Sequence, residues 1–412
     1  MARGFFTRDE IQTLPRPRRT YRSGPDCVSC KLYRGCVSPK MKPTGKGSRK
    51  FLFIAESPGN REDQRGTQLI GKGGQELRRV LKANGFDLDG DARKTSAINC
   101  RPPDARKNAT PTPKEIDCCR PILEEELKRN PPDVIIPLGA AAMQALIGTR
   151  WKKALGGIGK WRGFQIPDRH LKAWICPTLD PSFVEWKSSE APSLVFRNDL
   201  TAALALEGPP PDSLIAEKLE DSVQVIVDPE KVRKFLRWIL RTAPARIAFD
   251  YETTGLKPYA EGHRIVSCAI AWKKDRCVAF PSEDDGVRLL LSRVLTDARI
   301  RKIAANLQFE EIWSRQLLGV SVYPWDWDTC LGAHVVDNRP GITSVKFQAY
   351  VNFGIMDYDS HIGPKLKSKG NSAHGFNRVD EIDQGELLIY NGVDSLIEFR
   401  LAGMQRTEIA AV

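Results

Sequence analysis

A proline-rich, charged segment divides this chain and limits what it can fold into. Residues 207–222 read E-G-P-P-P-D-S-L-I-A-E-K-L-E-D-S, and consecutive prolines favour a stiff, extended connector. Patterned regions lie on both sides, so the sequence predicts two domains, 1–206 and 223–412, joined by a linker over 207–222. The length of 412 residues agrees with two domains, because a single hydrophobic core stops growing well below that size.

Both regions alternate strand-like and helix-like runs. In the first, the expected strands are 51–55, 96–100, 133–139 and 172–176, and the expected helices are 75–84, 114–127 and 140–147. In the second, the expected strands are 223–227, 246–252, 266–272 and 277–281, with a helix over 229–242 and mostly helical segments after the last strand. Such alternation predicts two tandem α/β domains, the first built on a mainly parallel sheet.

The overall charge favours a polyanionic partner. The net charge is +12, and the early segment R-P-R-R-T-Y-R, Arg16 to Arg22, is either a phosphate-tracking arm or a solvated basic tail. No run of eighteen apolar residues is present, so we expect no membrane span. The N-terminus lacks the apolar core of a signal peptide, so we expect a cytoplasmic protein.

Four of the ten cysteines suggest a metal centre. Cys27 and Cys30 have the C-x-x-C spacing that lets two thiolates share one ion. Cys100 opens C-R-P-P, and Cys119 lies in D-C-C-R-P. Ten cysteines in a cytoplasmic chain argue against a disulfide scaffold. The thiolates suit either zinc or an iron–sulfur cluster, and their spacing does not decide between the two.

Paired carboxylates give the clearest chemical signal in the second region. In F-D-Y-E-T-T-G-L, residues 249–256, Asp250 and Glu252 lie two positions apart on an expected strand, so both side chains point to the same face. Carboxylates at the end of a strand, before a glycine-containing turn, are typical of a site for a hard cation such as Mg²⁺. The competing interpretation is an exposed strand edge that carries two acids.

Later residues favour the cation site. Asn306 and Glu310 lie in A-A-N-L-Q-F-E-E-I-W, and Tyr390 and Asp394 lie four apart in Y-N-G-V-D, on one face of a helix. The three segments resemble, in order, the D-x-E, N-x-x-F-D and Y-x-x-x-D motifs of the DnaQ-like 3′–5′ exonucleases, particularly the proofreading domain of family-A DNA polymerases. The resemblance spans residues 223–402 and implies a ribonuclease-H-like fold.

This resemblance implies a nuclease that uses two Mg²⁺ or Mn²⁺ ions. Asp250, Glu252 and Asp394 would hold the ions, and Tyr390 would orient the attacking water. Glu310 stands where the family has Asp, so we expect it to act through the second ion or its waters, with altered efficiency. Eighteen residues follow Asp394, so we expect either that the domain works alone or that it serves a DNA polymerase made as a separate polypeptide.

The first region resembles the family 4 uracil-DNA glycosylases over residues 25–205. The segments that carry the likeness are 54–63, 66–77, 99–121, 135–148 and 177–183. The resemblance implies a 4Fe–4S cluster whose four ligands are Cys27, Cys30, Cys100 and Cys119. The neighbouring Cys118 is an alternative fourth ligand, and Cys36 is a weaker spare.

Three positions depart from what uracil excision needs. The family's stacking aromatic aligns with Leu69, its base-gripping Asn with Ser96, and its leaving-group His with Asp180. Leucine offers no π face, serine is too short for a bidentate grip, and an ionised aspartate repels a uracil anion. Glu56 and Asp63 match acidic motif positions. We therefore expect lost or greatly reduced excision.

Retained features point instead to DNA contact. Gly59, Gly66, Gly71 and the proline-rich loop 102–113 are expected to shape a surface that meets the phosphate backbone. The predicted function is a prokaryotic or viral replication protein that proofreads a primer 3′ end beside a separate polymerase. Two alternatives stay open: a bifunctional repair enzyme with active base excision, and a non-enzymatic scaffold.

Overall fold

A computed structural model provides the structure of the chain. The basic segment Arg16 to Arg22 and the centre of the loop 102–113 lie outside the residues that it describes. Those described residues are 24–103, 110–151, 154–187, 190–215, 217–356, 358–368 and 374–411.

The first domain is built on a five-stranded sheet with the order β2-β1-β3-β5-β4. All neighbouring strands run parallel except β4 and β5, which are antiparallel. The predicted mainly parallel sheet is therefore confirmed. Its strands are β1 (Phe51–Ala55), β2 (Ala92–Ser96), β3 (Val134–Pro137), β4 (Ile166–Asp168) and β5 (Ala173–Ile175).

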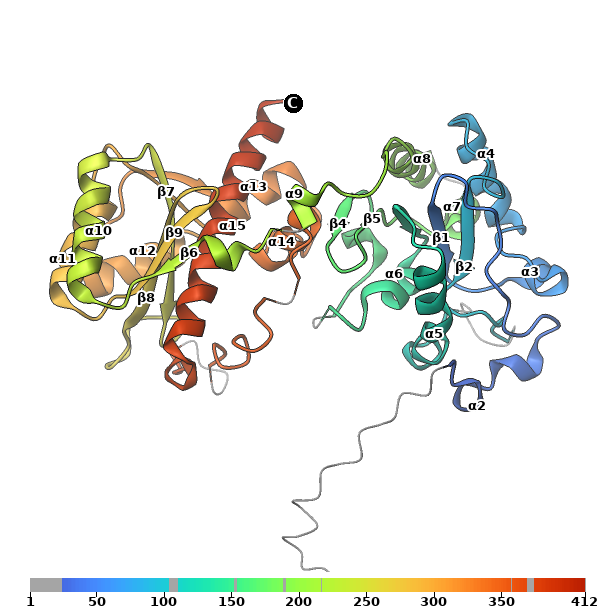
Figure 1. Cartoon of the computed structure of the whole chain (residues 1–412), viewed down its shortest axis with the longest axis horizontal. Coiled ribbons are helices and arrows are strands. Elements are labelled where there is room, and N and C mark those ends of the chain that lie inside the picture. Colours follow the sequence, from blue (N-terminus) through green and yellow to red (C-terminus); the bar gives the residue numbers. More distant parts are fainter. Residues whose placement is uncertain are drawn as a thin grey trace, which may run out of the picture.

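Helices cover both faces of this sheet (Figure 1). One apolar cluster joins β1 and β3 to α4 and α8, and another joins them to α5 and α6. The helices are α2 (Cys27–Cys30), α3 (Asn60–Arg65), α4 (Lys72–Ala83), α5 (Pro113–Arg129), α6 (Ala140–Ile147), α7 (Pro181–Lys187) and α8 (Glu190–Leu204), with 3₁₀ turns at Leu32–Gly35 and Ile158–Lys160.

The strand expected over 96–100 was wrong, because β2 ends at Ser96. Charged residues hide the true strand from a hydrophobicity pattern. Arg93 forms a two-point ion pair with Glu126 at 2.6 and 3.0 Å, and the fully buried Lys94 pairs with Asp89. A buried cation is stable only when such a partner accompanies it.

The second domain contains a six-stranded sheet with the order β11-β10-β7-β8-β9-β6. An antiparallel meander, β7-β8-β9, is extended by parallel β10 and β11 on the β7 side, which is the predicted ribonuclease-H-like arrangement. The strands are β6 (Val223–Val225), β7 (Arg246–Thr253), β8 (Ile265–Lys273), β9 (Arg276–Pro281), β10 (Arg301–Ala304) and β11 (Trp325–Asp328).

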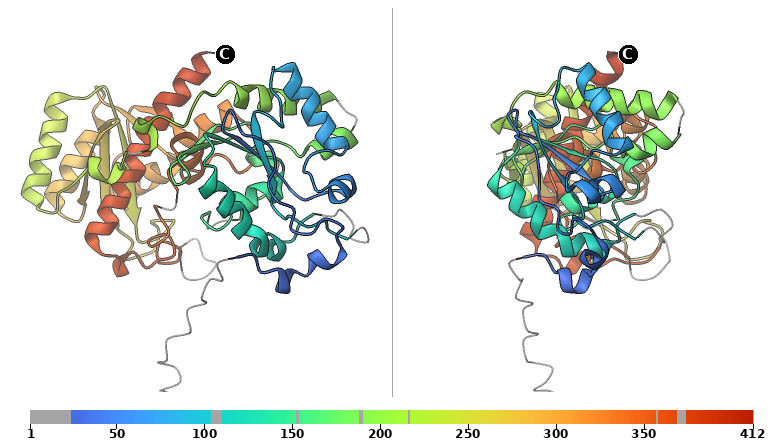
Figure 2. Two further views of the ribbon diagram at one scale, coloured as in Figure 1. Left: turned by 45° about the vertical axis from the view of Figure 1, so that its right-hand side comes forward. Right: turned by 90° about the vertical axis from the view of Figure 1, so that its right-hand side faces the viewer.

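The long helix α15 crosses one face of this sheet and contacts β7, β8 and β9 (Figures 1 and 2). On the other face, α10 and α11 pack through an apolar cluster that includes Leu236 and Leu291. The helices are α10 (Pro229–Thr242), α11 (Asp285–Thr296), α12 (Gln308–Trp313), α13 (Thr329–Val336), α14 (Val345–Phe353) and α15 (Gln384–Ala410), with a π-helical turn at Ser314–Leu318 and a 3₁₀ turn at Val379–Glu381.

The connecting segment is not simply extended. It contains α9 (Asp212–Ile215) and a 3₁₀ turn over Leu219–Ser222. Glu217 receives both guanidinium nitrogens of Arg400 at 2.6 and 2.7 Å, and its carbonyl oxygen accepts from Arg169. The linker is therefore tied to both domains, because Arg169 follows β4 and Arg400 lies on α15.

The two domains also meet directly through α14. Phe347 and Tyr350 pack against Trp151 and Trp161 of the first domain, with ring centroids 5.0–6.3 Å apart. The Tyr350 hydroxyl donates to Asp168 Oδ2 at 2.8 Å in a buried setting. We call the first-domain surface made by Trp151, Trp161, Phe164 and Asp168 the aromatic socket.

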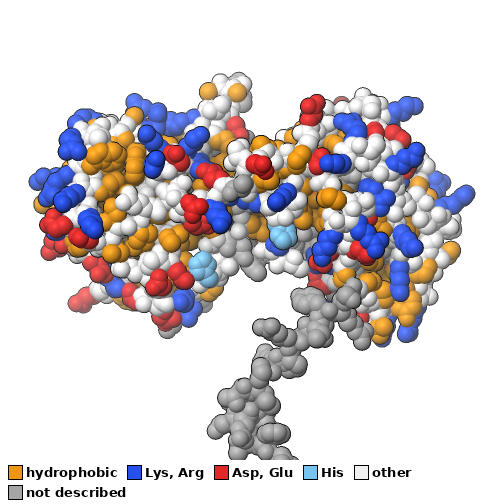
Figure 3. All heavy atoms as spheres, viewed as in Figure 1, with side chains coloured by type: hydrophobic (Ala, Val, Ile, Leu, Met, Phe, Trp, Pro, Cys, Tyr) orange, Lys and Arg blue, Asp and Glu red, His pale blue; other side chains and the backbone are white. Residues whose placement is uncertain are grey.

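The surface of both domains carries Lys and Arg side chains interspersed with Asp and Glu on the face shown in Figure 3. Among the described residues, no helix is long and apolar enough to cross a membrane.

Candidate functional site

Three carboxylates of the second domain converge on one point. Asp250 and Glu252 project from the same face of β7, and Asp394 projects from α15. One oxygen of each lies within 4.8 Å of the others, and in the described part of the chain this is the only group of His, Cys, Asp or Glu side chains that is so close. The alternation of a strand and the position of α15 thus bring together residues about 140 positions apart.

Two further acids lie beside this group. Glu310 on α12 and Glu398 on α15 are 2% and 1% exposed, and each has an Oε2 atom with no hydrogen-bond partner. Glu398 follows Asp394 by one helical turn and so lies on the same side of α15. Buried carboxylate oxygens without partners are costly, and a bound cation is one common explanation for them.

Burial and mutual repulsion act on all these groups. Desolvation, together with the nearby Asp394 carboxylate, raises the pKa of Asp250 to about 8. Desolvation also raises the pKa of Glu252, Glu310 and Glu398 well above the ordinary range, and the Asp250 carboxylate adds to each of these three shifts. A neighbouring positive charge is what would let the group ionise together at neutral pH.

Asn391 fixes the orientation of Asp250. Its side-chain nitrogen donates to Asp250 Oδ2 at 2.6 Å and to the Asp250 carbonyl oxygen at 3.2 Å, while Ser267 donates to its oxygen at 3.1 Å. Asn391 is fully buried, so this chain of bonds holds the carboxylate in one rotamer.

A lysine that the sequence did not single out enters the site from α14. Lys346 Nζ donates to both Asp394 oxygens at 2.8 Å and to the Tyr390 hydroxyl at 2.9 Å. It lies 4.0 and 4.3 Å from the ring centroids of Tyr358 and Tyr390. The Tyr358 hydroxyl also donates to Asp394 Oδ1. Asp394 and Tyr390 are therefore held in a small network of fixed geometry.

The turn before α12 places Glu310. Asn306 has a left-handed backbone, with φ of 58°, a conformation that asparagine tolerates better than most residues. Asp328 accepts from the Asn306 and Leu307 backbone nitrogens at 3.1 Å and also caps α13. One side chain thus ties the turn to the end of β11.

The charge balance of the site fits two divalent cations. Five carboxylates, if ionised, contribute −5, and the Lys346 ammonium contributes +1, so the described groups sum to −4. Two Mg²⁺ or Mn²⁺ ions would cancel that charge, and oxygen ligands are those that these ions prefer. The five acids are Asp250, Glu252, Glu310, Asp394 and Glu398.

The metal-free protein should lose stability as the pH rises from about 4, where an unfolded Asp ionises, to about 8, the folded-state pKa of Asp250. The folded state binds more protons than the unfolded state in this window, so the free energy of unfolding falls with pH. Thermal unfolding in EDTA between pH 5 and pH 8 measures this loss of stability as a fall in Tm.

Two comparisons isolate the cause of that loss. Adding Mn²⁺ at pH 8 should raise Tm, because the ions replace the missing protons. Glu398→Gln should raise the EDTA Tm at pH 8 and reduce the gain from Mn²⁺, while the matched exposed change Glu386→Gln should alter neither. A metal-free Tm that increases with pH and ignores Mn²⁺ would contradict the assignment.

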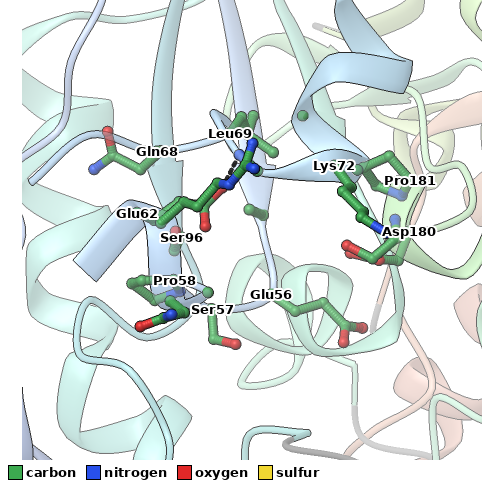
Figure 4. A pocket seen from close by; sticks show the side chains of 18 of the residues that line it. Glu56, Ser57, Pro58, Glu62, Gln68, Leu69, Lys72, Ser96, Asp180 and Pro181 are labelled. Carbon is green, nitrogen blue, oxygen red and sulfur yellow. Dashed lines mark hydrogen bonds between the residues drawn. The ribbon is translucent and has the colours of Figure 1, made fainter. Parts of the chain in front are cut away.

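The first domain contains a separate cavity of about 800 Å³. It lies at the carboxyl ends of β1 and β2, and its lining includes Glu56, Leu69, Ser96 and Asp180 (Figure 4). The structure thus brings together the four positions that the sequence identified. The cavity is open and large enough for a nucleobase.

Two carboxylates shape the chemistry of this cavity. Burial, together with the nearby Asp180 carboxylate, raises the pKa of Glu56 to about 7. Burial also raises the pKa of Asp180. Asp180 Oδ1 accepts from the Ser182 and Phe183 backbone nitrogens at 2.8 and 3.3 Å, and thereby caps α7. Asp180 therefore has a structural role at the start of α7.

The cavity loop that contains Leu69 has a strained backbone at this residue, although leucine has no aromatic ring to stack on a base. Leu69 has φ of 56°, a conformation that is rare for such a residue. Gly74 lies so close beneath it that an added Cβ would be 2.1 Å from the Leu69 carbonyl oxygen. Glu62 Oε1 accepts from the Ile70 and Gly71 nitrogens at 3.0 and 2.6 Å, which fixes the same loop.

The remaining matched acid, Asp63, has a structural position. Its two oxygens accept from the Val37 and Ser38 backbone nitrogens at 3.1 and 2.9 Å, and its side chain is buried. Asp63 thus joins the cysteine-bearing N-terminal segment to α3 and the cavity. Ser96 Oγ is buried without a hydrogen-bond partner, so it offers no grip comparable to that of an asparagine.

Five thiols surround a second, small cavity, lined by Cys27, Cys30, Cys100, Cys118 and Cys119. Burial raises the pKa of the Cys119 thiol, and Cys30, Cys100 and Cys27 raise it as well. Burial also raises the pKa of Cys118, on which Cys30 acts together with the charged Asp26, Lys114 and Asp117. Burial raises the pKa of Cys100 to about 11 and that of Cys119 to about 12. The Cys36 thiol instead donates to the Leu32 carbonyl oxygen.

The spacing of the thiols fits a cluster better than a single ion. No three of these sulfurs, all of which lie in described segments, are within 4.8 Å of one another. Four sulfurs on one zinc would lie about 3.8 Å apart, given Zn–S bonds of about 2.3 Å. A multi-iron cluster separates its thiolate ligands more widely.

Sequence comparison identifies relatives of the first domain. Residues 43–203 match the model of the uracil DNA glycosylase superfamily. A type-4 uracil-DNA glycosylase of Thermotoga maritima is 30% identical over 182 residues, which is 44% of this chain and 86% of that protein. A type-4 uracil-DNA glycosylase of Pyrobaculum aerophilum is 32% identical over 164 residues, 39% of this chain and 79% of that protein.

Structural comparison returns nucleases that include Escherichia coli RNase D, an exoribonuclease. It is 14% identical, with a TM-score of 0.36, and the match covers 46% of this chain and 45% of RNase D. At this TM-score, the assignment of the second domain depends on its own sheet order and side chains.

Proposed function

The chain belongs to the uracil-DNA glycosylase superfamily through its first domain, and we propose that it is a DNA-acting protein whose catalytic centre lies instead in its second domain. The second domain would be a metal-dependent 3′–5′ exonuclease. The observation that supports this most directly is the convergence of Asp250, Glu252 and Asp394 within 4.8 Å, with Tyr390 one helical turn from Asp394.

The site residues have distinct roles in this proposal. Asp250, Glu252 and Asp394 would hold divalent ions, with Glu310 and Glu398 facing the second ion or its waters. When bound, such ions supply a Lewis acid for the phosphate and an activated water. Asn391 keeps Asp250 in its rotamer, and the Tyr390 hydroxyl orients the nucleophile. Glu310 replaces the family's Asp without leaving the site, because α12 begins beside β10.

The first domain would serve as a DNA- or partner-binding unit without base excision. Its cavity would keep the loops on which the family resemblance rests, but Leu69, Ser96 and Asp180 would remove stacking, edge recognition and anion stabilisation. Phosphate contacts from such a domain would add salt-sensitive affinity. Tethering would also raise the local concentration of the nuclease at a primer 3′ end.

Cys27, Cys30, Cys100 and Cys119 would hold an iron–sulfur cluster of the 4Fe–4S type. Cys27, Cys30 and Cys100 all act on the pKa of the Cys119 thiol, and this supports Cys119 as the fourth ligand in preference to Cys118. The cluster would be structural, because Asp63 links its N-terminal segment to the cavity wall.

A role in replication proofreading, beside a separately encoded DNA polymerase, completes the proposal. Its support is the order of the three nuclease motifs together with the DNA-repair ancestry of the first domain. Co-purification from the native source tests this part, because a polymerase should accompany the protein through several columns.

Replacing Asp250 tests the nuclease. Asp250→Asn should lower the Mn²⁺-dependent release of nucleotides from a 3′-labelled DNA strand by about two to three orders of magnitude, because it removes a metal-binding charge without changing shape. Glu386→Gln, an exposed change at the start of α15, should leave the rate unchanged. Undiminished release by Asp250→Asn would refute the site, and a purely structural protein would release nothing in any form.

Uracil excision is tested in the Asp250→Asn background, so that the nuclease does not consume the substrate. Incubation with uracil-containing duplex, followed by alkali, should give no strand cleavage. The triple change Leu69→Phe, Ser96→Asn and Asp180→His should restore cleavage, since each residue returns one missing interaction. Cleavage without the triple change, abolished by Glu56→Ala, would instead establish a bifunctional repair enzyme.

The cysteine assignment predicts a contrast between two neighbours. Cys119→Ser should abolish bound iron, acid-labile sulfide and visible absorbance, whereas Cys118→Ser should retain all three. Metal analysis of protein purified without oxygen provides the measurement. Retention of iron by Cys119→Ser with its loss from Cys118→Ser would reverse the assignment, and zinc in place of iron would overturn the cluster.

A further inference from the structure

Helix α14 belongs to both domains at once. Phe347 and Tyr350 occupy the aromatic socket of the first domain, while Lys346, the residue beside Phe347, reaches into the carboxylate site of the second. Nothing in the local sequence S-V-K-F-Q-A-Y marks this lysine as functional. Its position results from the docking of the two domains.

The lysine is held on every side that the structure describes. Its three N–H donors match three acceptors, the two Asp394 oxygens and the Tyr390 hydroxyl, all at 2.8–2.9 Å. The rings of Tyr358 and Tyr390 flank the ammonium at 4.0 and 4.3 Å. A solvated surface lysine has no such fixed geometry, because its long side chain retains its rotamer freedom.

The bonds have a directional consequence for Tyr390. Because the tyrosine oxygen accepts from Lys346, the tyrosine's own proton must point to another part of the site. Lys346 also fixes the plane of the Asp394 carboxylate, because it contacts both of its oxygens. The lysine therefore sets the orientation of two groups that face the reacting phosphate in the proposed nuclease.

We propose that Lys346 is a positioning residue of the nuclease, and that the first domain keeps it in place by seating α14. This inference depends on the proposed nuclease function and assigns the glycosylase-like domain a direct part in it. The domain acts as the rigid support for one side of the catalytic site.

The seating of α14 is tight at both ends. Phe347 lies 5.0 Å from Trp161 between ring centroids, and Tyr350 bonds Asp168, which also pairs with Arg150 at 2.9 Å. After the helix, Gly354 has φ of 64°, and an added Cβ would lie 1.8 Å from the Pro167 carbonyl oxygen. A helix held so closely cannot shift without moving Lys346.

Lys346→Met and Lys346→Arg test the positioning role in the full chain. The methionine variant should lower kcat by about 10–100-fold, the usual effect of losing a residue that orients a metal ligand, with little change in KM or in the number of Mn²⁺ ions bound. Lys346→Arg should recover part of the loss. Isothermal titration with Mn²⁺ and single-turnover assays supply the measurements.

The outcomes separate the possible roles. If the wild-type protein is active and Lys346→Met has the same kcat, this inference alone would be overturned. Tighter Mn²⁺ binding with retained activity would also overturn it, because the lysine would then be a stand-in for a metal ion. An inactive wild-type protein would overturn the proposed nuclease and this inference together.

A second pair of variants tests the contribution of the socket. Phe347→Ala should lower kcat by about tenfold or more, because displacements near 1 Å are costly for catalysis, while Mn²⁺ stoichiometry stays the same. Leu290→Ala is the matched control, since it removes buried volume from α11, away from both the site and the socket. With both assayed well below their Tm, equal activity of the two variants would refute the support role.

Discussion

Repulsion among buried carboxylates is the constraint on which the second domain depends. Asp250, Glu252 and Asp394 lie within 4.8 Å of one another, and Glu310 and Glu398 are buried beside them. A core of this kind opposes folding unless protons or cations neutralise it. The six-stranded sheet, the long α15 and the bond from Asn391 supply the rigidity that keeps these charges together. In the proposed nuclease, the same carboxylates that would bind the metal ions therefore lower the stability of the metal-free fold.

Under our proposal, the first domain shows the opposite relation between fold and chemistry. Its fold, its cysteine cluster and its loop geometry remain, down to the left-handed backbone of Leu69 and the close approach of Gly74. In our proposal, Leu69, Ser96 and Asp180 stand at the positions of the side chains that uracil excision requires. Asp180 now caps α7, and Asp63 ties the cysteine segment to α3. If this proposal is correct, the fold keeps these constraints in the absence of the reaction.

The sequence predicted the features that depend on local periodicity. Asp250 and Glu252 share a strand face, and Tyr390 and Asp394 share a helix face, because two and four residues are the natural repeats of those elements. Residues that depend on long-range packing could not be found this way. Lys346 reaches Asp394 across 48 positions, and Glu398 differs from an ordinary helix-surface glutamate only by its burial.

Some strands were predicted wrongly from the sequence, and the cause again lies in buried polar residues. β2, β10 and β11 were missed or displaced because charged residues occupy buried positions in or beside them. Lys302 on β10 is fully buried and donates to the Asp297 and Tyr323 carbonyl oxygens, and Lys94 is buried against Asp89. A hydrophobicity pattern assigns such residues to the surface, because it scores each residue by its polarity and takes no account of the hydrogen-bond partners that allow a charge to be buried.

The contact at Gly354 has a consequence for how the protein meets DNA. No room is left for even a methyl group against Pro167, and Glu217 ties the linker to both domains, so these contacts hold the first-domain cavity and the carboxylate site of the second domain at a set separation. If both domains contact one DNA strand, as proposed, that strand would have to bridge this separation. The interface would then set how many nucleotides lie between the phosphates bound by the first domain and the 3′ end bound by the second.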